Sequence, residues 1–176
     1  MKNYIIDIIY RNKNNVDHTT NKLLGSNVNM APEGYHTITP LLRVKESLKL
    51  IDFLKQAFEA KEISCYNQKD GSIMHAEVKI GDSIIMVSDS TLEWKSTSCA
   101  LYLYVDDTDK RYERALEYGA TSLREPRDEF YGNRCAAVID RFGNQWWIAT
   151  RKEKLSGEDI DNSSDSDMDE SQTFSI

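Results

Sequence analysis

A histidine and a glutamate stand two residues apart in the stretch GSIMHAEVKIGDSIIMVSDS, residues 71–90. Imidazole and carboxylate groups are common general acids and bases, and both also bind metal ions. Side chains of a strand alternate between its two faces, so the apolar residues between and around the pair should pack under a helix while His75 and Glu77 share the opposite face. This spacing makes His75 and Glu77 candidate catalytic residues, with Glu77 or Asp89 tuning the histidine.

The same pair has two further interpretations. Polar groups that converge in a hollow mark a ligand-binding site, so His75 and Glu77 could contact a ligand without any covalent chemistry. They could also only hydrogen-bond to each other and to water in a wet cavity. The residues alone leave these alternatives open.

The pair lies inside a repeated unit. The stretches LLRVKESLKLIDFLKQAFEA, from Leu41, and LYLYVDDTDKRYERALEYGA, from Leu101, each predict a strand that runs directly into an amphipathic helix. Three short strands follow each helix, separated by turn sequences such as QKDG and DRFGN. The order β-α-β-β-β therefore occurs twice, at a spacing of about 60 residues, which indicates two copies of one supersecondary unit.

The predicted helices and strands have these positions. Apolar residues recur at helical spacing, at Leu50, Ile51, Leu54, Ala57 and Phe58 in the first helix and at Tyr112, Ala115, Leu116 and Tyr118 in the second. Asp106 or Asp107 suits the start of the second helix, and Gly119 suits its end. The strands after the helices are expected at about 62–66, 73–80 and 83–88, and at about 121–124, 134–140 and 145–150. One helix covers one face of each sheet, so the other face stays open unless the two copies share it.

This repeat resembles the vicinal oxygen chelate superfamily, which includes glyoxalases, bleomycin-resistance proteins and extradiol dioxygenases. The stretches MHAEVKIGDSIIMVSD, YGNRCAAVIDRFGNQWWIAT and KEKLSGED are similar to its PhnB-like branch, over about residues 34–159. The resemblance implies an α+β fold in which two tandem βαβββ modules form an open, eight-stranded, barrel-like cleft. The expected parts are a flexible N-terminal extension (1–33), a glyoxalase-like domain (34–155, with repeats at about 34–92 and 98–152) and an acidic, disordered tail (156–176).

In this superfamily the cleft often binds its ligand through a metal ion held by four inward side chains. The resemblance places these positions near Thr39, Ile85, Ala100 and Trp147. None of the four is His, Glu or Asp, whereas a divalent cation needs about three or four nitrogen, oxygen or sulfur donors. His75 and Glu77 remain the obvious donors, and further acids would have to join them. We therefore expect neither a metal nor another cofactor.

Aromatic and polar side chains are expected to line the cleft instead. Strand parity puts Arg43, Tyr102 and Tyr104 on the concave side, and the resemblance puts Tyr131 in a bordering loop and Trp147 at a former ligand position. The predicted ligand-binding residues are Arg43, Asp89, Tyr102, Tyr104, Tyr131, Arg134 and Trp147; Asp140 is a further candidate, and Trp146 should be core. Such a lining suits a small planar or amphipathic organic molecule, whose acidic group Arg43 could pair with.

Three functions follow from these features. The first is a small-molecule binding protein of the bleomycin-resistance type, which the missing metal ligands and the aromatic lining favour. The second is a metal-independent lyase or isomerase in which His75 transfers a proton next to a carbonyl, so enzymatic activity stays an open question. The third is a scaffold whose acidic tail recruits a partner, with Tyr102 and Tyr104 only filling a collapsed barrel.

Composition limits the partners and the compartment. The formal net charge of −7 gives no basic footprint for nucleic acid, and no apolar run approaches the ~20 residues that span a bilayer. Asp7 interrupts the short apolar patch at the start, so no signal peptide is expected. Three cysteines without a CxxC pair predict reduced thiols in a cytoplasmic protein. The family resemblance implies a homodimer that binds a small organic ligand.

Overall fold

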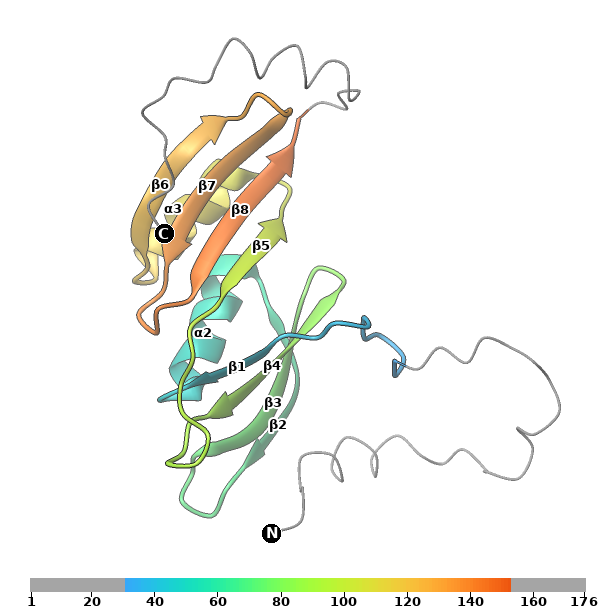
Figure 1. Cartoon of the computed structure of the whole chain (residues 1–176), viewed down its shortest axis with the longest axis vertical. Helices are drawn as coiled ribbons and strands as arrows, with labels where there is room; N and C mark the ends of the chain where they lie inside the picture. Colours follow the sequence, from blue (N-terminus) through green and yellow to red (C-terminus); the bar gives the residue numbers. More distant parts are fainter. Residues whose placement is uncertain (1–30, 153–176) are drawn as a thin grey trace, which may run out of the picture.

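A computed structural model describes residues 31–152 as two four-stranded sheets, each with one helix (Figure 1). The first unit consists of β1 (Leu41–Val44), α2 (Ser47–Phe58), β2 (Lys61–Asn67), β3 (Ile73–Ile80) and β4 (Ser83–Asp89). The second consists of β5 (Ala100–Tyr104), α3 (Thr108–Glu117), β6 (Thr121–Asp128), β7 (Asn133–Ile139) and β8 (Gln145–Arg151). The predicted α+β class and the two tandem βαβββ modules are confirmed.

Both sheets have the same strand order. It is β1-β4-β3-β2 in the first sheet and β5-β8-β7-β6 in the second, and the first strand of each unit pairs in parallel with the last. A parallel pair needs a long crossover, which the helix and the two hairpin strands of each unit supply. The helix therefore covers one face of its sheet and leaves the other face uncovered.

The start of α2 is held from outside the helix. The predicted apolar residues Leu50, Ile51, Leu54, Ala57 and Phe58 are all buried. Glu46 precedes the helix with a φ of 60° and makes no side-chain cap. Asp89, at the end of β4, accepts a hydrogen bond from the Ser47 amide at 2.8 Å, so it satisfies one of the free N–H groups of the first turn.

The ends of α3 follow the sequence signals, with one exception. The Asp107 carboxylate caps the helix by accepting from the Lys110 amide at 3.1 Å. Gly119 follows the helix with a φ of 94°, which suits glycine. The expectation that Tyr118 joins the apolar face is wrong. It lies beyond the last helical residue, is 38% exposed, and has the guanidinium of Arg114 over its ring.

The two units meet through their helices, behind the sheets in Figure 1. The Phe58 ring lies 5.1 Å from the Trp146 ring, centroid to centroid, and Arg114 of α3 donates to the Gln56 carbonyl of α2 at 2.8 Å. Trp146 is 1% exposed, as predicted for a core residue, and its indole N–H donates to Asp140 at 3.0 Å. This contact locks the second sheet to the first helix.

The expected N-terminal extension and acidic tail lie almost entirely outside the described residues, so their boundaries stay predictions. Within residues 31–152, neither helix has the length and apolar character of a membrane span. The three cysteines, Cys65, Cys99 and Cys135, form no disulfide.

We expect Trp146→Ala to lower the free energy of unfolding by about 3–5 kcal/mol, because it empties a buried site and removes one of the donors to Asp140. Trp147→Ala, one residue further on and on the opposite face, should cost only about 1 kcal/mol. Urea unfolding followed by circular dichroism measures both. Equal losses would show that the two faces of β8 are not differently packed.

Candidate functional site

The predicted parity of β3 is correct. Ala76, Val78 and Ile80 belong to the core under α2, and the residues between them face the other way. His75 and Glu77 are nevertheless only 2% and 7% exposed. The helix is on the far side of the sheet, so another part of the chain must cover the pair.

That cover is Tyr35, from the segment that precedes β1. Its hydroxyl donates to one oxygen of Glu77, while the Ser64 hydroxyl donates to the other oxygen at 3.2 Å. His75 Nε2 lies 3.3 Å from the same oxygen that Tyr35 contacts. Burial and the adjacent carboxylate raise the pKa of the Tyr35 hydroxyl, which keeps it a donor at neutral pH. Glu77 is thus the centre of a closed hydrogen-bond network.

His75 is the incompletely satisfied member of this network. Among the described residues its Nδ1 atom has no hydrogen-bond partner, although the atom is buried. A buried polar atom without a partner is unfavourable, and it marks a place where a water or ligand atom would be stabilised. Proton transfer by His75 to a bound molecule would require access to a side chain that is 2% exposed.

Arg43 and Asp89 differ in placement. Arg43 pairs with Ser88 in the ladder, on the same face as His75, and its guanidinium lies 5.0 Å from the Trp94 ring centroid. Asp89 instead accepts from the Ser47 amide and, at 2.6 Å, from the Ile73 amide. The two carboxylate oxygens thus accept hydrogen bonds from the backbone N–H groups at the start of α2 and at the start of β3. The expectation that Asp89 faces the cleft is corrected: its role in the structure is to cap these elements.

The open face of the second sheet carries two rows of side chains that cross all four strands, in the order β5-β8-β7-β6. One row is Tyr102, Trp147, Ala137 and Arg124, and the next is Tyr104, Ala149, Cys135 and Arg127. Three of the four residues in the middle of the face are therefore small, Trp147 being the exception, with tyrosines along one edge and arginines along the other. Of the predicted residues, Tyr102, Tyr104 and Trp147 come together here.

The aromatic side chains of this face contact one another around a cysteine. The rings of Tyr102 and Tyr104 lie 5.2 Å apart, and they are 48% and 68% exposed. The hydroxyls of Tyr102 and Tyr131 lie 3.1 and 3.6 Å from the sulfur of Cys135, which is buried. Burial raises the pKa of both hydroxyls, so both stay protonated at neutral pH. Tyr131 therefore joins the predicted cluster.

A cavity of about 310 Å³ lies between the two units. Pro40 and Ile84 line it from the first unit, and Tyr102 and Tyr104 line it from the second. Of the predicted site residues, all in the described part of the chain, only Tyr102 and Tyr104 are in its lining. The lining also includes Ile80, Leu101 and Trp146 from the helix sides, so this hollow is not the expected cleft between the open faces. The two tyrosines therefore border both the cavity and the open face.

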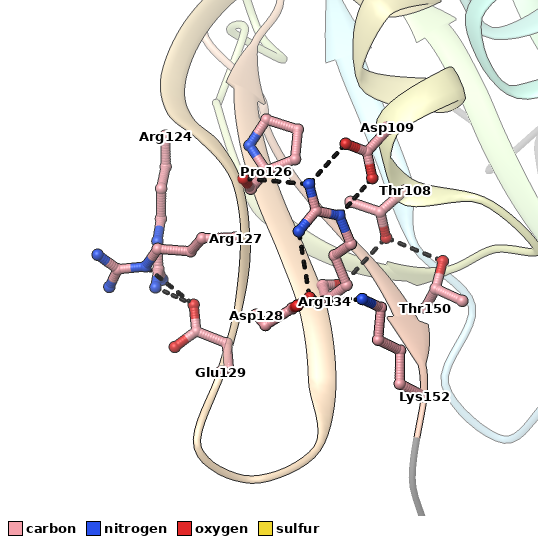
Figure 2. A network of polar contacts seen from close by, with 10 residues as sticks. All are labelled: Thr108, Asp109, Arg124, Pro126, Arg127, Asp128, Glu129, Arg134, Thr150 and Lys152. Carbon is pink, nitrogen blue, oxygen red and sulfur yellow. Dashed lines mark hydrogen bonds and ion pairs between the residues drawn. The ribbon is translucent and has the colours of Figure 1, made fainter. Parts of the chain in front are cut away.

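Arg134 lies on the helix side of β7, opposite Thr150, and not on the open face (Figure 2). Its Nε and Nη2 atoms donate to the two oxygens of Asp109 on α3, and Nη1 donates to Asp128 at 3.1 Å. Lys152 also contacts Asp128, at 2.9 Å. The expectation that Arg134 lines the cleft is corrected, because this network ties α3 to the β6–β7 hairpin.

Metal ligation finds little support in the donor set. Asp140 is occupied by the Trp146 indole and by the Phe142 and Asn144 amides, and Ile85 is part of the core under α2. Within residues 31–152, His, Cys, Asp and Glu form no group of three or more that could hold an ion. A site built from these residues alone would lack the three or four donors that a divalent cation requires.

The sequence analysis missed Tyr35, Arg124 and Arg127. Tyr35 lies 42 residues from its partner, and nothing in its local pattern points to that contact. The two arginines stand three apart, so strict alternation would put them on opposite faces. An irregularity in the β6–β7 register between them brings both onto the open face. The internal proline of the TSLREPRD stretch is the sequence feature that indicates such an irregularity.

Comparison with known proteins agrees with this architecture. A family model described as the Glyoxalase/Bleomycin resistance protein/Dioxygenase superfamily matches residues 15–148. Uncharacterized proteins of Mycobacterium bovis and Mycobacterium tuberculosis are each 29% identical to this chain over 134 residues, which is 70% of this chain and 88% and 79% of theirs.

Solved structures show the same fold. TioX from Micromonospora sp. ML1 is 20% identical, covers 69% of this chain and 100% of its own, and has a TM-score of 0.55. A glyoxalase/bleomycin resistance protein/dioxygenase family enzyme from Burkholderia phytofirmans PsJN is 21% identical, covers 69% of this chain and 99% of its own, and has a TM-score of 0.54. At these identities the likeness concerns the fold alone.

We expect Glu77→Gln to destabilise the protein near pH 7 and to have a much smaller effect in acid. Burial alone would raise the pKa of Glu77, but hydrogen bonds from Tyr35, His75 and Ser64 outweigh burial and hold the pKa below its ordinary value. A carboxyl with a lower pKa in the folded state stabilises that state above the unfolded pKa, and the stabilisation is lost as the pH falls through the folded pKa.

Urea unfolding between pH 7 and pH 3 measures this difference. Glu93→Gln, in the exposed loop after β4, makes the same change of charge at a site without such contacts and should cost little at any pH. A cost of Glu77→Gln that does not change with pH would contradict the role of the ionised carboxylate.

Proposed function

The chain belongs to the glyoxalase/bleomycin resistance protein/dioxygenase superfamily, and on that premise we propose that it binds a small aromatic molecule on the open face of its second sheet. The observation that carries the proposal is the exposure of Tyr102 and Tyr104, 48% and 68%, beside a cavity of about 310 Å³. Large aromatic rings left in water next to a hollow favour a ligand that covers them.

The surroundings of these rings suit an aromatic ligand. Ala137 and Ala149 are small and fully buried, so the ligand contacts the exposed rings of Tyr102 and Tyr104 beside them. Ring-to-ring packing gives such a ligand a preferred orientation. The protonated hydroxyls of Tyr102 and Tyr131 can donate hydrogen bonds to its polar atoms. Binding of this kind involves no covalent step and no metal ion.

A second candidate function is a metal-independent lyase or isomerase centred on His75 and Glu77. The unpartnered Nδ1 atom of His75 favours it, because this nitrogen can exchange a proton with a bound molecule. Because Tyr35 covers Glu77 and His75 is buried beside it, we favour the binding function over this enzyme. A scaffold function, with the barrel vestigial, is the remaining alternative, and it predicts no ligand at either face.

Three finer proposals accompany this function. The chain is a PhnB-like member of the superfamily, on the motifs MHAEVKIGDSIIMVSD and YGNRCAAVIDRFGNQWWIAT. It forms a homodimer, since an uncovered apolar sheet face can be completed by a second copy. It works in the cytoplasm, which suits three unpaired cysteines among the described residues.

We expect neutral bicyclic aromatics such as 2-naphthamide to bind the wild-type protein and raise its melting temperature. Tyr104→Ala and Trp147→Ala should each weaken binding by about three- to tenfold, as the loss of one aromatic contact implies. Thermal shift and isothermal titration calorimetry measure the change. Tyr118→Ala removes another exposed tyrosine, 38% exposed, from the end of α3 and should leave the affinity unchanged.

The same experiment separates the functions. If no neutral or acidic bicyclic aromatic binds, the binding function is wrong and the scaffold gains support. If a bound compound is converted, and His75→Ala abolishes conversion while the affinity is kept, the enzyme is the better description.

A further inference from the structure

Two arginines of β6 share the open face with the aromatic cluster. Arg124 lies opposite Ala137 and Arg127 lies opposite Cys135, at the far ends of the two rows that begin with the β5 tyrosines. Both guanidinium groups donate to one carboxylate, that of Glu129 in the β6–β7 loop (Figure 2). The positive edge of the face therefore already holds an anion, which the protein itself supplies.

Arg124 makes fewer contacts than Arg134. Arg134 uses its Nε and Nη2 atoms for both oxygens of Asp109, the side-on geometry that matches a planar carboxylate. Arg124 uses only Nη2, which contacts one oxygen of Glu129. Its Nε has no partner among the described residues, although the atom is buried. Arg124 thus uses only one of the two nitrogen atoms, Nη2 and Nε, that could bind a carboxylate side-on.

This edge lies next to the aromatic surface. The guanidinium carbon of Arg124 is 6.0 Å from the centroid of the Trp147 ring, because the intervening Ala137 is too small to separate them. An anion held by Arg124 would therefore lie about one ring width from a molecule packed on Trp147. A small aromatic acid has this arrangement of a flat body and a two-oxygen anion.

We propose that Arg124 recognises the carboxylate of an aromatic acid and that Glu129 is a stand-in anion, which the ligand displaces. The proposal deepens the proposed function, since the aromatic surface must first bind the body of the ligand. One carboxylate replaces another, so the charge of the site does not change and no guanidinium is left unpaired during the exchange. Glu129 directly follows β6 in the hairpin loop, where its side chain is 10% exposed, so displacement means that the carboxylate turns outward into water.

The test compares 2-naphthoate with its neutral analogue 2-naphthamide by isothermal titration calorimetry at pH 7. Arg124→Gln should weaken naphthoate at least tenfold and change the affinity for the amide less than about twofold. Glu129→Gln should strengthen naphthoate binding severalfold, because it removes the competing carboxylate, and should leave the amide unchanged. Lys110→Gln removes a positive charge, as Arg124→Gln does, but on the helix side and away from the face, so it should alter neither affinity.

The outcomes separate this inference from the function on which it rests. If Arg124→Gln weakens both compounds equally, or if Glu129→Gln weakens naphthoate, the anion role is wrong while aromatic binding stands. Binding of the amide but not of naphthoate to the wild-type protein also overturns the anion role alone. If neither compound binds, both proposals fail. Should Arg124→Gln not fold, the response to Glu129→Gln decides.

Discussion

A four-stranded sheet has two faces, and each unit of this chain has a single helix to cover them. Residues that alternate along a strand are therefore divided between a helix side, which excludes water, and a side whose cover must come from elsewhere. The helix sides meet through Phe58 and Trp146, so the core of each unit is continuous with that of the other. Every functional question about the molecule concerns what the two remaining faces contact.

The face away from the helix is covered differently in the two units, although their strands have the same order. In the first, Tyr35 covers the face and donates to Glu77, which makes His75 a buried residue. In the second, Tyr102 and Tyr104 stay largely in water. A covered polar network stabilises a fold, whereas an uncovered aromatic surface is available to other molecules, so the difference in cover is the reason that we propose binding at the second face.

Sequence alone was sufficient for the architecture and for the parity of most strands. Strand and helix periods, the turn signals and the repeat locate the elements to within a few residues, and parity correctly places Arg43 and Tyr102 on the faces away from the helices and Trp146 in the core. It was insufficient where a side chain has a partner far along the chain. Asp89 caps a helix that starts 42 residues earlier, and Arg134 pairs with an aspartate on α3. Such contacts depend on the tertiary fold and leave no local pattern.

The rows across the sheets show how the repeat has diverged. The first unit has Leu41, Met86, Glu77 and Ser64 where the second has Tyr102, Trp147, Ala137 and Arg124. Glu77 thus occupies the position of Ala137, and its carboxylate binds donors from its own unit.

In the second unit Ala137 supplies no carboxylate, and the carboxylate on this face comes from Glu129 in a loop instead. An acid fixed in the middle of a strand cannot leave its partners, whereas an acid on a loop can. The two acids thus differ in their partners: Glu77 accepts from two hydroxyls and lies beside an imidazole, whereas Glu129 pairs with two guanidinium groups, and it is this second pairing that we propose a ligand exchanges.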